Sequence, residues 1–417
     1  MELSDINLLS RDIFTEGVPH DWFTYLRKNA PVYKHPEPDG PGFWVISKHE
    51  DVGIVGRDAK TFSSAAKHGG VVGLEELPPE RKQEMEEQAA FTGNMMLYMD
   101  PPDHTLYRKI VHDGFRPRMI WALENVIRER AVKIVDDAVA KGSCDFVVDI
   151  AAELPLQAIA ELLGVPMEDR HKIFDWSNRM IGSEDPEYAV DEENVRNAQI
   201  EMFMYAQELA ADRRANPRGD IVTTLLEAEV EGHSLNELDF NLFFLLLAVA
   251  GNETTRNAMS HGMAALLENP DQYQVLVEDP SVIDTAVEEI VRWASPVMYF
   301  RRNVTQSTEL RGVPMKEGDK LSVWYISANR DEDVFVDPFS FDVRRSPNEH
   351  IAFGHGHHFC LGFNLARLEI KVLFEELAKR VTKIESVGDI SRLRSNFISG
   401  IKHLPVRFAD VRQPAGV

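Results

Sequence analysis

A continuous helical pattern over residues 235–268 limits the possible folds more than any other feature of this chain. The residues "SLNE" before it predict a capping box, with Ser234 as the cap and Glu237 reaching back, and "NP" at 269–270 supplies the stop. At roughly 1.5 Å per residue such a helix extends about 50 Å. Because it is also strongly apolar, we expect it to run through the centre of a mostly helical protein.

The polar sequence "AGNETT" interrupts this apolar helix at residues 250–255. A glycine inside a helix costs roughly 1 kcal/mol relative to alanine, and buried polar side chains need hydrogen-bonding partners. The Thr254 hydroxyl can donate to the carbonyl of Ala250, one turn earlier, and Gly251 leaves room for a ligand beside the backbone. A solvated helix face at Glu253 and Arg256 is the alternative, and this segment alone does not decide between them.

Composition is that of a globular protein, with 44% hydrophobic and 27% charged residues. The formal net charge of −23 argues against nucleic acid or an anionic membrane as the main partner. The two cysteines, Cys144 and Cys360, exclude a disulfide framework and favour a reducing compartment. The N-terminus lacks the pattern of a signal peptide, and the longest apolar run, at 242–251, is too short to span a bilayer. We therefore predict a cytoplasmic protein without a membrane anchor.

Secondary structure is predicted to be mainly α with small β-sheets. Strands are expected at "FWVISK" (43–48) and "KLSVWYIS" (320–327), and residues 329–353 look irregular. Because no linker interrupts the chain, we predict one domain over residues 1–417, with loose termini at 1–20 and 409–417. Besides 235–268, the expected helical segments are 106–141, 151–164, 170–182, 190–214 and 282–294.

The stretch "IAFGHGHHFCLGFNLARLE" (351–369) surrounds Cys360 with three histidines and three glycines. Those histidines are too crowded to complete a tetrahedral zinc site, and His358 is too close in sequence to act easily as a base for Cys360. The glycines permit a tight turn, and apolar residues at helical spacing follow, so Cys360 lies at a helix N-terminus, where amide dipoles favour a thiolate. A single thiolate on a glycine-rich loop meets the requirement of an axial haem ligand.

Two further residue pairs are weak signals by themselves. Glu289 and Arg292 share a helix face at i and i+3, and their apolar neighbours suggest a partly buried ion pair. His104 and Arg108 follow "MDPP" at i and i+4, a spacing suited to holding a carboxylate. Solvated side chains would produce the same patterns.

These motifs together resemble the cytochrome P450 family over residues 20–408. The resemblance implies the fold of that family, with a long central helix over a haem b whose iron is bound by the Cys360 thiolate. The family's central-helix motif is matched at 250–255, and its E-x-x-R motif at Glu289 and Arg292, with Arg345 as the arginine that completes the structural network. The haem-binding signature is matched at Phe353, Gly354, Gly356, His358, Cys360, Gly362, Leu365, Ala366 and Glu369. The resemblance assigns the haem propionates to His104, Arg108, Arg302 and His358.

The resemblance also implies a monooxygenase that uses O2 and two electrons. Thr254 would steady the bound oxygen species and Glu253 would supply the protons that release water. The chain leaves no room for a flavin or iron–sulfur domain, so the electrons would come from an acidic ferredoxin and its reductase. The basic segment 104–133 would lie on the face where that ferredoxin docks. We further expect a monomer.

The expected substrate is a small hydrophobic molecule, because the segments implied to line the pocket are apolar. The chain looks most similar to bacterial members that hydroxylate the terminal methyl of branched lipids and sterol side chains. Terpene hydroxylation is the alternative, and a non-catalytic haem sensor is the alternative from another class, although a sensor would not require the acid and Thr of "AGNETT". The expected pocket residues are Met95, Met96, Leu97, Phe244, Leu247, Ala248, Val297, Met298 and Phe397.

Overall fold

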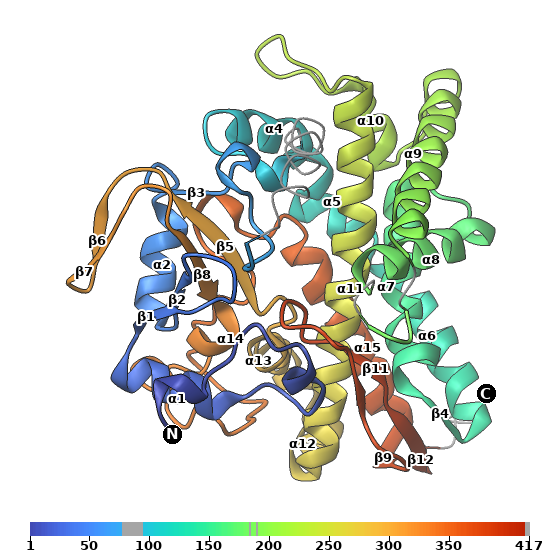
Figure 1. The fold of residues 1–417 in the computed structure, drawn as a ribbon. Coiled ribbons are helices and arrows are strands. Elements are labelled where there is room, and N and C mark those ends of the chain that lie inside the picture. The colour runs from blue at the N-terminus through green and yellow to red at the C-terminus, as the bar shows by residue number, and fades with distance from the viewer. Residues whose placement is uncertain (77–94, 183–184, 189–190, 413–417) are drawn as a thin grey trace.

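The longest helix, α11 (Glu237–Glu268), crosses the molecule and packs against α7, α9, α13 and α15 (Figure 1). The structure, a computed structural model, describes residues 1–76, 95–182, 185–188 and 191–412. The helix begins two residues later than predicted, because Asn236 and not Ser234 is the cap. The Asn236 side chain accepts from the Asp239 amide at 2.9 Å, and the Asp239 carboxylate accepts from the Asn236 amide at 3.3 Å.

Helices α8 and α9 lie across α11 from the largest sheet, whereas α1 and α2 lie beside that sheet (Figure 1). Within the described residues the α-helices besides α11 are α1 (His20–Asn29), α2 (His49–Arg57), α4 (Asp103–His112), α5 (Pro117–Ala122), α6 (Glu124–Lys141), α7 (Glu153–Leu163), α8 (Arg170–Ile181), α9 (Glu192–Ala215), α10 (Ile221–Glu227), α12 (Pro270–Glu278), α13 (Ile283–Ala294), α14 (Tyr325–Ala328) and α15 (Phe363–Arg380).

The β-structure of the described chain is small. The largest sheet has the strand order β1-β2-β8-β5-β3, in which only the β2–β8 pair is parallel. The others have the orders β4-β12-β9, β10-β11 and β6-β7. The strands are β1 (Val32–His35), β2 (Phe43–Ile46), β3 (Phe62–Ser63), β4 (Ser143–Asp145), β5 (Tyr299–Val304), β6 (Thr308–Leu310), β7 (Val313–Met315), β8 (Lys320–Trp324), β9 (Val381–Ser386), β10 (Ser391–Arg392), β11 (Ile401–His403) and β12 (Pro405–Val411).

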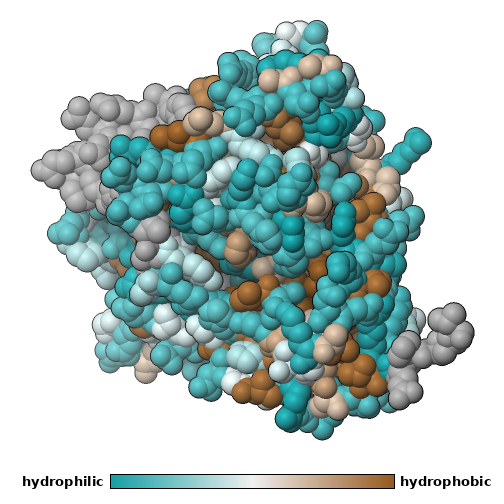
Figure 2. Space-filling model, turned by 90° about the vertical axis from the view of Figure 1, so that its right-hand side faces the viewer, coloured by the Kyte–Doolittle hydropathy of each residue, from teal (hydrophilic) through white to brown (hydrophobic). Residues whose placement is uncertain are grey.

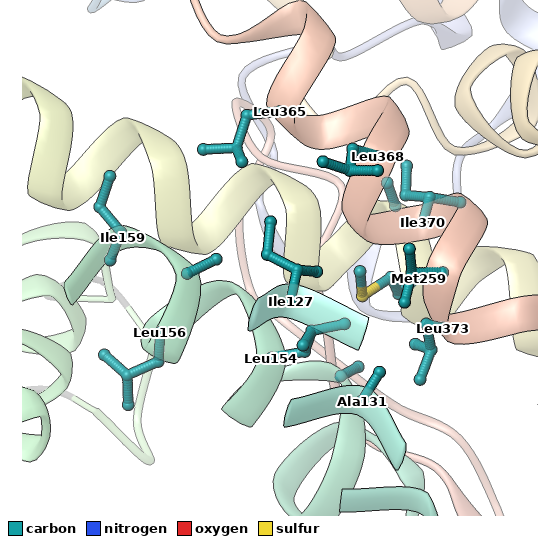
Figure 3. Packing of buried hydrophobic residues seen from close by; sticks show 14 of the residues in the cluster. Ile127, Ala131, Leu154, Leu156, Ile159, Met259, Leu365, Leu368, Ile370 and Leu373 are labelled. Carbon is teal, nitrogen blue, oxygen red and sulfur yellow. The ribbon is translucent and has the colours of Figure 1, made fainter. Parts of the chain in front are cut away.

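The main core lies where α6, α7, α11 and α15 meet. Figure 3 shows apolar side chains from all four helices pointing toward one another, including Ile127 of α6, Leu154 of α7, Met259 of α11 and Leu373 of α15. These side chains are almost completely buried. Their burial removes apolar surface from water, which stabilises the fold by roughly 25 cal/mol for each Å². The helix that carries "AGNETT" and the helix that follows Cys360 therefore share one rigid core.

Three sequence predictions on secondary structure need correction. The expected helix 106–141 is divided into α4, α5 and α6, because Pro117 cannot continue a hydrogen-bonded helix and instead starts α5. The expected strand 320–327 ends at Trp324, where the chain enters α14. The N-terminal 20 residues are not loose, since Leu8 and Phe14 are buried against the largest sheet. At the other end, residues up to Val411 belong to β12, and 413–417 lie outside the described residues.

The surface is polar, in keeping with the net charge. Figure 2 shows a face on which hydrophilic residues predominate and hydrophobic ones occur in small groups. Among the described residues no helix combines the length and the apolar character needed to cross a bilayer.

His403 connects three separate segments of the chain and gives a pH-dependent contribution to stability. Its Nδ1 lies 2.6 Å from Asp145 Oδ2 and its Nε2 lies 2.8 Å from Glu187 Oε1. Hydrogen bonds to these carboxylates and their charges raise the pKa of His403 above its ordinary value. A raised pKa in the folded state means that the stabilisation is fully present below about pH 6.5 and is lost as the pH rises through the folded pKa.

We therefore expect His403→Gln to lower the melting temperature at acidic pH and to have little effect once His403 of the wild type is neutral. Thermal unfolding of both proteins across this pH range measures the difference. His171→Gln, at an exposed histidine of α8, is the control and should show no such pH dependence. An equal effect of His403→Gln at all pH values would contradict the prediction.

Candidate active site

Cys360 lies in the loop between a single 3-10 turn (Gly356–His358) and α15. The Cys360 amide donates to the Phe353 carbonyl at 2.8 Å, which closes the loop. Gly354 and Gly356 have φ of 77° and 73°, in the region that favours glycine. A Cβ on Gly356 would also collide with the carbonyl oxygen of Gly56 in α2. The glycines thus allow the loop to fold tightly against α2 and to present the thiol from a fixed position.

We predicted that the position of Cys360 at a helix N-terminus would favour the thiolate, but the surroundings of Cys360 favour the neutral thiol. Burial raises the pKa of the Cys360 thiol, and the amide of Gly362 and the charges of Arg108 and Arg367 oppose this effect only in part. A thiolate at this position therefore needs a positive charge at the sulfur, which a bound metal ion supplies. Within the described residues no group of three or more His, Cys, Asp and Glu side chains comes together as a metal site.

The thiol lines a cavity of about 240 Å³ between α11 and α15, which we call the Cys360 cavity. Its walls are mostly apolar, as in binding sites for hydrophobic molecules. From α11 it receives a stripe at helical spacing, and the side chains of Val297, Phe300 and Tyr325 cover it from the direction of the largest sheet. The α11 stripe consists of Phe243, Leu246, Leu247, Ala250, Gly251, Thr254, Thr255 and Ala258.

Thr254 and Glu253 are adjacent in sequence but face different surroundings. The Thr254 hydroxyl lines the Cys360 cavity and donates to the Ala250 carbonyl at 2.7 Å, as predicted from the spacing. Glu253 is only 2% exposed and does not line the cavity; it forms an ion pair with Arg256 and accepts from Asn257 Nδ2 at 3.0 Å. The alternative of a solvated helix face is therefore wrong, because Glu253 and Arg256 are both buried.

A cluster of basic side chains lies at one side of the cavity. The rings of His104 and His358 are 4.3 Å apart, and the charges of Arg302, His104 and Arg108 act on His358. Burial lowers the pKa of His104 to about 4 and that of His358 well below its ordinary value. In the described part of the chain, Arg108 and Arg302 form no ion pair with a carboxylate, and Nε2 of each of the two histidines is buried without a partner. Arg108 Nη1 donates to the His357 carbonyl at 3.4 Å, and Arg302 Nη1 donates to the Arg301 carbonyl at 2.7 Å.

Haem fits these residues. Its flat apolar ring suits the cavity, its two propionates suit the basic cluster, and its iron would supply the positive charge that Cys360 requires. The buried, unpartnered Nε2 atoms of His104 and His358 are the observation that this fit explains, because buried polar atoms are nearly always hydrogen-bonded.

The fully buried Glu289–Arg292 pair is the centre of a network that also includes the partly buried Arg345. Two hydrogen bonds of 2.7 Å join the two side chains, which are both 0% exposed. Arg345 Nε lies 3.1 Å from Glu289 Oε2, so the structure brings together the three residues predicted to form this network. Burial raises the pKa of Glu289, but the hydrogen bonds and charges of Arg292 and Arg345 outweigh it, and the net pKa is lowered.

The structure corrects the predicted pocket in part. Met96, Leu97, Leu247 and Val297 line the Cys360 cavity, whereas the other predicted residues do not. Residues 90–94, from the same predicted segment, lie outside the described residues. The five residues that belong elsewhere are Met95, Phe244, Ala248, Met298 and Phe397.

Geometry explains the displacement of all of these residues except Met95. The helical period places Phe243 and Leu246 on the cavity face in place of Phe244 and Ala248. Met298 points to the opposite side from Val297 because side chains alternate in an extended chain. Phe397 packs on Phe300, with ring centroids 5.8 Å apart, and Phe300 lines the cavity instead. Counting the α11 period back from Thr254 would have identified Phe243 from the sequence.

The single thiol, the apolar cavity and the basic cluster define a haem-thiolate protein. Within this class the chain belongs to the cytochrome P450 family, whose family model matches residues 152–381, more than half of the chain. The predicted fold is confirmed by a solved cytochrome P450 of Mycobacterium marinum in complex with pseudoionone, with a TM-score of 0.87 and 37% sequence identity. That similarity covers 97% of this chain and 98% of the other. The activity of the family is haem-dependent monooxygenation with O2.

Two kinds of relative are similar over nearly the whole chain. A steroid C26-monooxygenase of Rhodococcus jostii is 45% identical over 404 residues, covering 95% of this chain and 83% of the relative. A methyl-branched lipid omega-hydroxylase of Mycobacterium tuberculosis is 41% identical over 420 residues, covering 98% of this chain and 95% of the relative.

Proposed function

We propose that this protein hydroxylates the terminal methyl group of a branched-chain lipid or of a sterol side chain. The apolar lining of the Cys360 cavity is the observation that carries the proposal, since it suits a hydrophobic substrate. Outside the basic cluster and Cys360, the described lining has one carboxyl group, that of Glu369, and burial raises the pKa of this carboxyl well above the ordinary value, which favours the neutral form. The similarity to relatives that are named for these two reactions supports the choice of substrate class.

In this proposal the protein groups position the substrate and deliver protons, while the haem, when bound, supplies the oxidising chemistry. Cys360 would hold the iron, and His104, Arg108, Arg302 and His358 would hold the propionates. The Thr254 hydroxyl faces the Cys360 cavity and would hold a proton at its Oγ1. Glu253 is paired with Arg256, so its side chain has to leave this pair before it can reach solvent or Thr254. We therefore assign Glu253 to the supply of protons to Thr254 from the far side of α11.

The substrate class is tested by titrating the haem-loaded protein with three groups of compounds: methyl-branched lipids, sterones and terpenes. Displacement of water from the haem by a bound substrate shifts the spectrum toward high spin. We expect tight shifts with the first two groups and hydroxylation at a terminal methyl. Shifts confined to terpenes would contradict the proposal, and the absence of product from all three would contradict the monooxygenase role.

Thr254→Ala should uncouple electron consumption from product formation. The substitution removes the hydroxyl that faces the Cys360 cavity, so oxygen activation loses its local proton and reduced oxygen is released instead. We expect roughly a hundredfold loss of product per electron, at the lower end of the 10²–10⁴-fold contribution typical of general acid catalysis, and unchanged substrate affinity. Hydrogen peroxide and product are measured per NADH consumed. Thr254→Ser is the control and should retain most of the coupling.

We propose further that an acidic ferredoxin docks beside α5, on the face of the molecule formed by the segment 104–133. Helix α5 packs against α15, the helix that follows Cys360, so this position brings a partner close to the thiolate. Not all seven basic residues of the segment are available, because Lys109, Arg128 and Lys133 form ion pairs with carboxylates of this chain. Arg118 remains without a carboxylate partner among the described residues, and Trp121 nearby is 68% exposed.

Arg118→Glu should raise the KM for an acidic ferredoxin several-fold, and more at low salt, while leaving the substrate-induced spin shift unchanged. The matched control is Arg214→Glu on α9, which makes the same change of charge at an exposed arginine elsewhere. Equal KM values for the two variants would exclude α5 from the docking face.

A further inference from the structure

A second cavity, separate from the Cys360 cavity, lies on the other side of the 395–400 segment. It has a volume of about 250 Å³ and receives residues from the N-terminal segment, the second half of α11, α13 and the 392–400 segment. In Figure 1 these parts meet where the dark-blue N-terminal segment lies near α13 and the red C-terminal loop. Since a water molecule takes roughly 30 Å³ in the liquid, this space suits a small molecule and is much too large for one or two waters.

Arg330 is the main reason to expect a ligand there. It lines the second cavity, is only 2% exposed, and donates from Nη2 to the Trp293 carbonyl at 2.8 Å, with its guanidinium 4.7 Å from the centroid of the Trp293 ring. Its Nε and Nη1 are buried and find no acceptor among the described residues. A buried guanidinium that pairs with no carboxylate and leaves two of its three nitrogens without an acceptor is rare, because unmet buried donors are costly.

The other polar groups of the second cavity add positive charge and donors. Arg392 lines it and acts electrostatically on His261, as does Arg330. His20 also lines it, and its Nδ1 is buried without a partner in the described chain. The single acidic residue of the lining, Glu268, is exposed and forms no ion pair with either arginine.

Apolar side chains form the rest of the wall, among them Phe14, Val18, Ala264, Leu393 and Ile398. A cavity lined both by two arginines and by apolar side chains is complementary to a molecule with a negatively charged head and a short hydrocarbon chain. An inorganic anion would leave the apolar part filled only with water.

We propose that the second cavity binds a small organic carboxylate, with its head on Arg330 and its chain against the apolar wall. Burial and the charges of Arg292 and Arg27 lower the pKa of Arg330, and a bound anion would oppose this effect by stabilising the guanidinium charge. The proposal does not depend on which substrate the haem side accepts.

Two paired segments of the chain, one from each cavity lining, connect the two cavities. The Ser399 amide donates to the Pro296 carbonyl at 2.8 Å, and Val297 and Ile398 form a β-bridge. Pro296 and Val297 line the Cys360 cavity, whereas Ile398 and Ser399 line the second one. A ligand in the second cavity therefore contacts the segment that shapes the substrate site, and by linkage each ligand should change the affinity of the other by the same factor.

Hexanoate is the probe for the test, used in calorimetric titration of the haem-loaded protein. The iron is first saturated with 4-phenylimidazole, so that hexanoate in the Cys360 cavity does not contribute. We expect one bound hexanoate per protein, and at least tenfold weaker binding to Arg330→Gln. Ala264→Leu, which fills the apolar part of the second cavity and keeps both arginines, should weaken binding as well. This second variant tests the proposal even if Arg330→Gln fails to fold. The control, Arg407→Gln on the surface of β12, should bind like the wild type.

Absence of calorimetric binding would show that the second cavity holds only water and would overturn the proposal. Binding that all three variants retain would place hexanoate elsewhere and would overturn it equally. A change in the substrate affinity on addition of hexanoate, lost in Ala264→Leu, would support the coupling between the cavities. Failure to find a lipid or sterol substrate would leave this result untouched, because the titration is done with the haem side blocked.

Discussion

Cys360→Ser should abolish monooxygenase activity and the red-shifted Soret band of the reduced carbon monoxide complex, which is characteristic of thiolate-bound haem. Serine keeps the shape of the side chain, but its hydroxyl stays protonated at neutral pH and gives the iron a much weaker donor. Cys144, the other cysteine of the chain, lies in β4 and does not line the Cys360 cavity, so it cannot take the place of Cys360. We expect activity to fall to the background of the assay.

Cys144→Ser is the matched control, since it removes the second of the two cysteines of the chain. Cys144 lies in β4, and burial raises the pKa of its thiol to about 12, so it is an unreactive thiol. This variant should keep the red-shifted band and full activity. A Cys360→Ser protein that retained haem, the band and activity would show that the iron is bound by another group.

Arg292→Leu should cause the largest loss of stability, because it leaves the Glu289 carboxylate in the core without its main partner. Two hydrogen bonds of 2.7 Å join this pair, and Arg292 Nη1 also donates to the carbonyls of Asn329 and Pro338 at 2.9 Å. Removal of one partner of a buried ion pair typically costs about 3–5 kcal/mol. Equilibrium unfolding in urea should therefore show a lower free energy of unfolding by this amount, or no folded haem-binding protein at all.

Arg344→Leu provides the control, since Arg344 pairs at 3.1 Å with Asp279 on the surface and both side chains are largely exposed. Exposed ion pairs contribute about 0–1 kcal/mol, so this variant should unfold nearly as the wild type does. Glu289→Gln with Arg292 intact should also be strongly destabilised. Equal stability of Arg292→Leu and Arg344→Leu would mean that the network contributes nothing to the fold.

The sequence predicted the local features of the site well. The Cys360 loop, the Thr254 hydrogen bond and the Glu289–Arg292 pair all depend on residues close together in the chain, where the helix period and glycine conformation fix the geometry. The errors arose where distant parts of the chain meet. The sequence did not show that Glu253 is buried beside Arg256, nor that Phe397 packs on Phe300 instead of lining the cavity.

By itself the sequence determined the long central helix, the single cysteine on its glycine loop and thereby the family, because these patterns are local and specific. Only the tertiary structure decided the rest. Packing of α11 against α7 and α15 selects which helix face lines the Cys360 cavity, and folding of the N-terminal segment toward α13 encloses Arg330 in the second. Burial and the absence of a partner are properties of neighbours far away in the chain, so no local pattern could have predicted them.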